Sequence, residues 1–426
     1  MNTKKYQILI AGGGITGSAL LYTLSQLPEI KNIALIEKNS TLGSLNSSSL
    51  RNSQTLHFGD IETNYNLEKA KLVNSGAQLV ADYLEKLPTN DGLFSHTQSM
   101  ILAVGEKEVA KLNKRFEDFK GLFPNLQKLE RAEIEKLEPK LIEGRDLDTP
   151  VLALCSKDRY TVDYEKLCKQ FVSDAQKNKS DIDIFFNTKI KQIKKTASGY
   201  EIYTDTEKFE AEIVIIAMGA HSLLFAKQLG YGLEYSLLPV IGDYYSTTKP
   251  LLNGKVYTMQ NEKLPFAAIH GDPNILNPDE TRFGPTALSL PILERGSMKT
   301  FFEFIKSTGL DWSSIASVIK INSDKEIIKF VLENLIYTLP LIGRYMFAKT
   351  LRKIVPTIHV ADLQKEKGIG GIRPQLVNKK ERRLLLGAAE ILGDNIIFNV
   401  TPSPGATACL QTAKRMTKQI NLFLNK

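Results

Sequence analysis

The chain of 426 residues has little cysteine, and the three it has are scattered. Cys155, Cys168 and Cys409 form no CxxC pair and show no metal-ligand spacing. A disulfide scaffold is therefore excluded, zinc and iron–sulfur chemistry are not expected, and no metal is predicted among the site residues. Isolated thiols of this kind are typical of reduced core side chains in a cytoplasmic protein.

Long hydrophobic runs are missing as well. No apolar stretch approaches the ~20 residues that cross a bilayer. Lys4 and Lys5 lead directly into the first expected strand, so we also expect no signal peptide. The net charge of +8 comes without an aromatic-interleaved basic motif, so no nucleic-acid partner is predicted. Hydrophobic content of 42% is ordinary for a soluble globular protein, and the length suffices for two domains.

One segment without acidic residues departs from this average. Between residues 334 and 360 cations such as Arg344 and Lys349 are interleaved with apolar side chains such as Leu341 and Phe347. A segment of this kind could lie on an anionic membrane surface. It could equally be a helix packed on its own domain with its cations in water, and from the segment alone we favour that second interpretation.

The first chemical signal is a glycine turn between an expected strand, 6–11, and an expected helix, 18–27. Gly12 permits the tight turn, Gly14 lets the backbone approach a pyrophosphate, and Gly17 lets the helix pack closely on the sheet. The helix N-terminus adds positive potential for phosphates. The turn therefore predicts a dinucleotide-binding unit.

Two further features suit a flavin held along its whole length. Glu37 ends a second expected strand, 33–36, where its carboxylate can accept hydrogen bonds from ribose hydroxyls. Near the other end of the chain, residues 399–407 read as a strand that breaks into small residues before the last helix. The predicted cofactor is therefore FAD. Its expected contacts include Gly12, Gly14, Ile15, Thr16, Gly17, Glu37, Lys38, Ile190, Gly219, Gly405, Ala406 and Thr407.

The predicted fold is α/β, a Rossmann-type FAD-binding domain with a parallel sheet, interwoven with a discontinuous α+β substrate domain. The FAD-binding domain is expected at 1–95, 150–235 and 366–426, and the substrate domain at 96–149 and 236–365.

Several elements are expected within these limits. They are a crossover helix at 163–178, a hairpin of 200–203 and 208–211, a separate buried strand at 213–217, one charged helical stretch at 106–138 and a last helix at 408–424.

Three polar segments are candidates for the chemistry. Residues 51–65 are costly to bury without ligands or partners, and His57 among them could face the flavin or substrate, or be structural. His270 ends a strand-like run and could act as a general base or cap a turn. Arg373, after two glycines, could grip a carboxylate with two hydrogen bonds or form an inter-domain salt bridge. With both near a flavin, the implied substrate is an anionic 2-hydroxy acid.

These segments closely resemble bacterial malate:quinone oxidoreductases over nearly the whole chain. The similarity rests on the segments 52–55 through 64–65, 264–272, 284–287 and 401–407. More remotely, the chain is similar to L-2-hydroxyglutarate dehydrogenases and the wider D-amino-acid-oxidase-like superfamily.

The resemblance implies FAD, L-malate as hydride donor, a membrane quinone as acceptor, and a peripheral protein on the cytoplasmic face of the inner membrane. It adds weight to the membrane interpretation of 334–360. It also implies that Asn52 and Ser53 contact the cofactor, that Arg373 holds a carboxylate, and that His270 is base or substrate ligand.

We therefore predict FAD-dependent oxidation of L-malate to oxaloacetate, with His270 or His57 taking the hydroxyl proton and the C2 hydride passing to flavin N5. Malate's second carboxylate needs another partner, for which Arg282, Tyr245 and Tyr257 are candidates. The alternatives are the same chemistry on another 2-hydroxy acid such as 2-hydroxyglutarate, an amine or amino-acid oxidase, and a binding protein that keeps FAD as a structural element.

Overall fold

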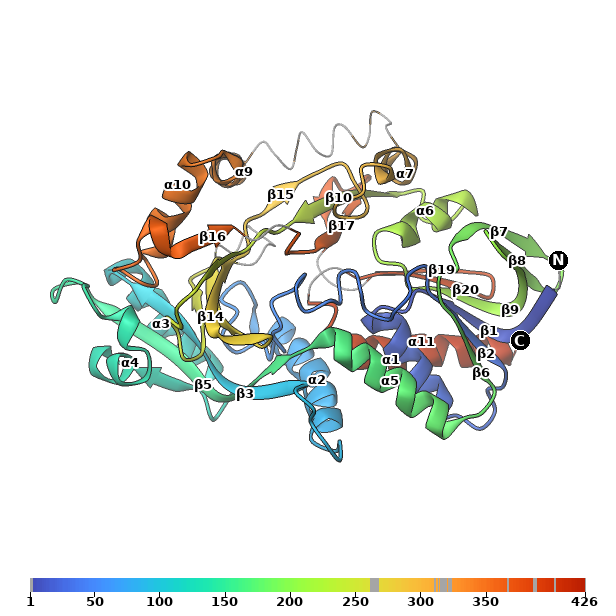
Figure 1. Cartoon of the computed structure of the whole chain (residues 1–426), viewed down its shortest axis with the longest axis horizontal. Coiled ribbons are helices and arrows are strands. Elements are labelled where there is room, and N and C mark those ends of the chain that lie inside the picture. Colours follow the sequence, from blue (N-terminus) through green and yellow to red (C-terminus); the bar gives the residue numbers. More distant parts are fainter. Residues whose placement is uncertain are drawn as a thin grey trace.

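The computed structural model describes residues 3–260, 268–309, 312, 314, 320, 324–365, 368–385, 389–401 and 404–425. Parts of two predicted motifs, 264–267 and 402–403, lie outside the described residues. The molecule is elongated, and both termini lie at one end of it (Figure 1).

A largely parallel sheet forms the end that carries the termini. Its order is β19 (Ala389–Gly393), β20 (Ile396–Val400), β9 (Lys208–Ile216), β1 (Thr3–Ala11), β2 (Ile33–Ile36) and β6 (Ile182–Phe185). Ile10 pairs with Leu35 on one side and with Ile215 on the other. β2 is buried along its whole length, as expected of parallel strands covered on both faces. The predicted Rossmann-type fold is confirmed.

Three helices cover one face of this sheet: α1 (Ile15–Ser25), α5 (Tyr164–Asn178) and α11 (Cys409–Leu424) (Figure 1). α5 is the predicted crossover helix, and Asp163 caps its N-terminus by accepting from two backbone N–H groups. α11 buries Leu410, Ala413, Met416 and Ile420, whose spacing places them on one face of the helix.

The rest of the chain builds two antiparallel or mixed sheets. The larger has the order β16 (Leu363–Lys365), β11 (Tyr245–Thr247), β14 (Asn277–Gly284), β13 (His270–Asn274), β12 (Lys255–Thr258), β3 (Phe94–Val104), β5 (Val151–Val162) and β4 (Gln127–Leu129). The smaller has the order β15 (Leu288–Ser289), β10 (Tyr235–Ile241), β17 (Ile372–Asn378) and β18 (Arg383–Leu384). The remaining helices and strands are α2 (Leu67–Leu84), α3 (Glu106–Phe119), α4 (Arg131–Leu137), α6 (His221–Gln228), α7 (Thr300–Thr308), α9 (Lys325–Thr338), α10 (Ile342–Leu351), β7 (Ile190–Thr196) and β8 (Gly199–Thr204), with 3-10 turns at Pro139–Leu141 and Val360–Asp362.

The expected single helical stretch over 106–138 is wrong. α3 ends at Phe119, and the chain then forms β4 and α4. Gly121 and Pro124 follow the helix end, and neither residue favours continuing a helix.

The hairpin strand at 208–211 and the buried strand at 213–217 are one strand, β9. Its first half pairs with β8, and β9 also pairs with β1 along nearly its whole length. A single extended strand therefore serves both the hairpin and the parallel sheet.

The domain limits stay a prediction, but two strands cross them. β5 was expected in the FAD-binding domain, yet it pairs with β3 over nearly its whole length, because both strands belong to the large sheet. β17 likewise pairs with β10 in the small sheet. Each of these pairings joins strands that the prediction assigned to different domains.

Candidate active site

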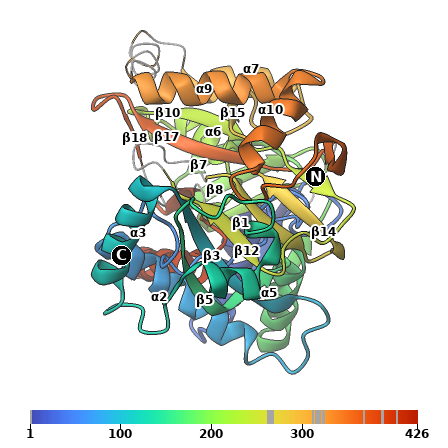
Figure 2. The ribbon, with the colours of Figure 1, turned by 90° about the vertical axis from the view of Figure 1, so that its left-hand side faces the viewer.

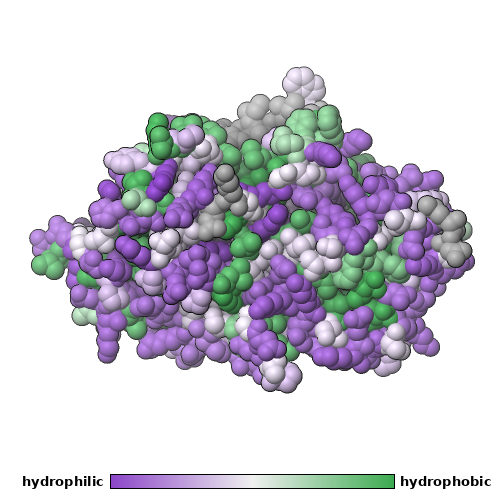
Figure 3. All heavy atoms as spheres, in the orientation of Figure 1, coloured by the Kyte–Doolittle hydropathy of each residue, from purple (hydrophilic) through white to green (hydrophobic). Residues whose placement is uncertain are grey.

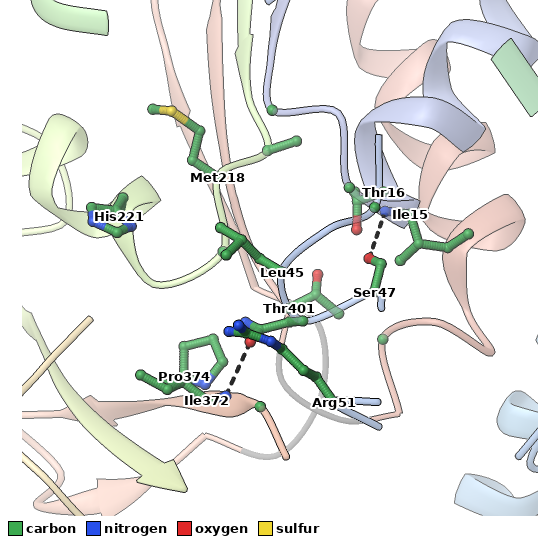
Figure 4. A pocket seen from close by; sticks show the side chains of 18 of the residues that line it. Ile15, Thr16, Leu45, Ser47, Arg51, Met218, His221, Ile372, Pro374 and Thr401 are labelled. Atoms are coloured by element: carbon green, nitrogen blue, oxygen red, sulfur yellow. Dashed lines mark hydrogen bonds between the residues drawn. The ribbon is translucent and has the colours of Figure 1, made fainter. Parts of the chain in front are cut away.

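A cavity of about 610 Å³ lies where the N-terminal glycine turn, the loop after β2, β17 and the start of α11 come together. Ligand sites are typically concave cavities of this size. Its lining is drawn from residues 12–16, 36–39, 43–47, 51–57, 188–191, 217–219, 371–374, 401 and 404–407, together with Tyr164, Gly242, Tyr244 and parts of α6 and α7 (Figure 4).

The glycines of the turn have distinct surroundings. A Cβ on Gly17 would lie 2.0 Å from the carbonyl oxygen of Gly12, and one on Gly12, whose φ is +107°, would lie 2.5 Å from that of Ala217. These two glycines therefore permit close backbone packing. A Cβ on Gly14 would meet only the Ser47 hydroxyl, at 3.5 Å, so Gly14 leaves space open toward the cavity.

Glu37 is fixed at the edge of the cavity. Its Oε2 accepts from the Gly13 N–H at 2.9 Å, and its Oε1 accepts from the backbone and side-chain amides of Asn39 at 2.8 Å. The Ser47 hydroxyl accepts from the Ile15 N–H at 3.0 Å and ties the next loop to the start of α1 (Figure 4). A carboxylate and a helix N-terminus thus face one elongated cavity, as the ribose and pyrophosphate of a dinucleotide require.

The predicted cofactor contacts collect in this cavity. Gly17 is the exception, because it packs α1 against the turn instead of lining the space. The other predicted contacts line the cavity: Gly12, Gly14, Ile15, Thr16, Glu37, Lys38, Asn52, Ser53, Ile190, Gly219, Gly405, Ala406 and Thr407. Their individual roles stay predictions.

His57 lines the cavity and is held at both its backbone and its ring. Its N–H donates to the Thr407 hydroxyl at 3.1 Å, and its Nδ1 lies 2.6 Å from Oε1 of buried Glu62. Because an ionised carboxylate can only accept, Nδ1 carries the proton and Nε2 is left as an acceptor. An imidazole oriented by a buried carboxylate is the arrangement of a general base.

The turn that carries Glu62 is held by Arg115 of α3. The buried guanidinium donates to the carbonyl oxygens of Glu62 at 2.7 Å and Tyr65 at 3.0 Å. Sequence reasoning missed both Glu62 and Arg115. The density of polar residues at 51–65 indicated a functional segment, but it did not identify Glu62 as the partner of His57.

Arg373 and Arg51 bring two guanidinium groups to the same cavity. Their segments are in backbone contact, since a Cβ on Gly371 would lie 2.7 Å from the Arg51 carbonyl oxygen. The Asn46 side chain accepts from the Ile372 N–H at 3.0 Å and fixes the approach, with Arg51 beside it in the cavity (Figure 4). Two cations in one cavity can bind a dianion.

Tyr244 also lines the cavity, close to Arg373. Burial raises the pKa of its phenol, and the charges of Arg373 and Arg282 oppose that rise. Tyr244 therefore stays protonated and can donate a hydrogen bond to a ligand.

His270 is not among the described residues that line the cavity. Its ring is buried and stacks on Tyr257 with the centroids 4.5 Å apart. Its Nε2 lies 3.5 Å from Oδ1 of buried Asp272, whose other oxygen is 3.9 Å from Nζ of Lys255. Burial lowers the pKa of His270 to about 4, against the opposing charge of Asp272, and lowers the pKa of Lys255 to about 8. Of the two candidate bases, the structure brings His57 to the cavity.

None of the three candidates for holding the second carboxylate is among the described residues that line the cavity. Arg282 is buried and donates to the carbonyl oxygens of Ser49 and Asn52, at 3.1 and 2.8 Å. Its charge is thus used to hold the 49–52 loop, which the sequence alone does not reveal.

The two tyrosines among those candidates are held by other side chains. Tyr245, at the start of β11, stacks on Phe347 with the ring centroids 4.5 Å apart, and both belong to one hydrophobic core. Tyr257 shares a hydrogen bond of 3.0 Å with the Thr55 hydroxyl. Arg51 and Tyr244 are the cavity residues that these predictions missed.

Comparisons with known proteins agree with this geometry. Residues 7–419 match the family model described as FAD dependent oxidoreductase. A probable malate:quinone oxidoreductase from Campylobacter jejuni is 40% identical, with all of this chain and 97% of the relative covered. The chain belongs to the malate:quinone oxidoreductases. Its cofactor is FAD.

Two further proteins are more distantly similar to this chain. The human mitochondrial L-2-hydroxyglutarate dehydrogenase is 25% identical, with 98% of this chain and 89% of that protein covered. The FAD-bound L-alpha-glycerophosphate oxidase of Mycoplasma pneumoniae has a TM-score of 0.70 at 20% identity, covering 98% of this chain and 95% of that chain. The second likeness shows a shared fold.

Proposed function

We propose that the cavity binds L-malate between His57 and the arginine pair Arg51 and Arg373, and that the protein oxidises it to oxaloacetate for transfer of the electrons to a quinone. The observation that carries this proposal is that His57, oriented by Glu62, lines the same cavity as Arg373 and the nucleotide-binding turn. The 40% identity to a probable malate:quinone oxidoreductase supports the choice of substrate and acceptor.

The protein groups bind the substrate and move its proton. Arg373, helped by the Tyr244 hydroxyl, holds one carboxylate, and Arg51 holds the other. Nε2 of His57 accepts the C2 hydroxyl proton, while Glu62 stabilises the imidazolium that forms. When bound, FAD supplies N5 as the acceptor of the C2 hydride and passes the electrons on to quinone.

We place the protein in the cytoplasm, peripheral on the inner face of the cell membrane. None of the helices in the described part of the chain is long and apolar enough to cross a membrane. To reach a quinone held in the bilayer, the protein would dock on the membrane surface.

The test is a substrate panel with the purified FAD-loaded protein and a soluble quinone analogue. L-malate should have the highest kcat/KM, ahead of D-malate, L-2-hydroxyglutarate and glycine, and turnover should depend on the quinone. A preference for L-2-hydroxyglutarate would keep the chemistry and change the substrate. Peroxide formation from glycine without quinone would replace the proposal with an amino-acid oxidase.

A further inference from the structure

Helix α9 carries its apolar face outward. Five aliphatic side chains share spacings of three or four residues along it and are exposed, Leu332 to 55%: Ile328, Val331, Leu332, Leu335 and Leu339. Residues so spaced form one stripe on a helix. A helix of a globular protein usually turns such a stripe to the core.

The inner face of α9 carries polar groups that fix this orientation. Asn334 is buried, and its side-chain oxygen accepts from the Ala287 N–H at 2.6 Å. Tyr337, one turn further on, packs edge-on against Phe347 and shares a hydrogen bond of 2.8 Å with Thr350. Turning the stripe inward would break these bonds and leave buried polar groups without partners.

The exposed stripe continues onto the start of α10. Leu341 is 85% exposed at a φ of +62°, and Ile342 and Tyr345 are exposed beside it. The α9–α10 apolar face is therefore Ile328, Val331, Leu332, Leu335, Leu339, Leu341, Ile342 and Tyr345. In two views α9, α10 and α7 occupy one edge of the molecule, and hydrophobic side chains gather along that edge (Figures 1, 2 and 3).

This face corrects the extent of the predicted membrane segment. The second half of 334–360 is core, because Phe347, Leu351, Ile354 and Val355 are buried in one cluster with Tyr245. The first half belongs to the exposed face, which also reaches back along α9 to Ile328. The segment predicted from the sequence therefore covers only one end of this exposed face.

Cations border the α9–α10 apolar face. Lys325 and Lys329 lie on α9 together with Glu326 and Glu333, and Nζ of Lys329 lies 3.9 Å from Oε1 of Glu333. Lys349 lies on α10 and Arg352 at its end, both exposed, so the excess of positive charge is at the α10 end of the face. Between 334 and 361 the chain carries no acidic residue. In such an arrangement the apolar stripe can contact lipid acyl chains while the cations contact anionic headgroups.

We propose that the α9–α10 apolar face docks this protein on an anionic lipid bilayer. The inference deepens the proposed function, since a membrane quinone must be reached from the bilayer surface. The α9 stripe would enter the boundary between headgroups and acyl chains, and the lysines would contact lipid phosphates.

The test is vesicle sedimentation of the FAD-loaded protein with phosphatidylglycerol–phosphatidylcholine vesicles and with pure phosphatidylcholine vesicles. The variant is Leu332→Gln with Leu335→Gln, which removes two apolar side chains from the middle of α9. The matched control is Leu72→Gln with Leu422→Gln, two equally exposed leucines far from α9 in the chain. All three proteins should reduce a soluble quinone analogue with L-malate equally.

We expect wild type and control to bind the anionic vesicles, less so at high salt and on neutral vesicles, and the α9 variant to bind at least about tenfold more weakly. Equal binding by the α9 variant, or no vesicle binding by wild type, would overturn the proposal. A wild-type dimer in light scattering that the α9 variant dissociates would also overturn it, because the face would then cover a second copy. A failure of malate oxidation would appear separately, in the soluble assay.

Discussion

Nδ1 of His57 lies 2.6 Å from Oε1 of Glu62, five residues further along the same loop. The contact holds the imidazole in the tautomer that leaves Nε2 free to accept a proton. Because Glu62 is buried, the charge interaction with an imidazolium is weakly screened. The pair gives the proposed base both its orientation and its counter-charge.

Glu62→Gln should slow flavin reduction by malate by about 100-fold, since the amide supplies no negative charge for the imidazolium. Malate affinity, followed by spectral titration, should change little, because Glu62 does not line the cavity. Glu68→Gln, an exposed carboxylate on α2, is the control. An unchanged reduction rate in Glu62→Gln would move the base away from His57.

Arg373→Ala should raise the malate KM by about 100-fold or more, the loss expected when a charge-assisted bidentate pair is removed. The protein should keep its yellow colour. Arg383→Ala, an exposed arginine on the neighbouring strand β18, should leave KM unchanged. Steady-state kinetics with a soluble quinone measure both, and an unaltered KM in Arg373→Ala would remove this residue from the substrate site.

Two glycines of the turn should respond differently to the same substitution. Gly14→Ala should give a folded apoprotein that no longer retains FAD, because its Cβ meets ordinary contacts in the protein but fills the space of the pyrophosphate. Gly17→Ala should destabilise the apoprotein itself by about 1–3 kcal/mol, since its Cβ would clash with the Gly12 carbonyl. Flavin absorbance and apoprotein melting distinguish them. A Gly14→Ala protein that stays yellow would contradict the assignment.

The buried His270 predicts a pH-dependent stability. Its folded pKa of about 4 lies below the ordinary value near 6.5, so the unfolded chain binds its proton first as the pH falls. Wild type should lose about 2 kcal/mol from this group between pH 7.5 and pH 5. The stability gap between wild type and His270→Gln, from urea midpoints, should narrow by that amount at pH 5. A gap that stays constant or widens would contradict the buried neutral imidazole.

The nucleotide-binding part of the site could be predicted from the sequence, because it depends on residues close together in the chain. The glycine turn, Glu37 and the small residues at 404–407 act through nearby backbone, so their spacing is informative. The choice between His57 and His270 depends on which side chain reaches the cavity, which tertiary packing decides. Tyr244 immediately precedes β11 and Tyr245 begins it, yet Tyr244 lines the cavity and Tyr245 lies in a hydrophobic core.

Helix α9 shows the same limit at the surface. Its apolar periodicity is readable in the sequence, but periodicity indicates a stripe and not the side to which it turns. The burial of Asn334 against Ala287 decides that side, and this contact joins residues 47 positions apart in the chain. Long-range contacts of this kind are what a single sequence leaves undetermined.

The most direct test of the account is anaerobic mixing of the FAD-loaded protein with L-malate while the flavin absorbance is followed. The account predicts rapid bleaching, reversal by a soluble quinone analogue, and slow bleaching in His57→Asn with FAD still bound. Bleaching by malate that is equally fast in His57→Asn would contradict the assigned base. No bleaching by L-malate at all would contradict the proposed reaction.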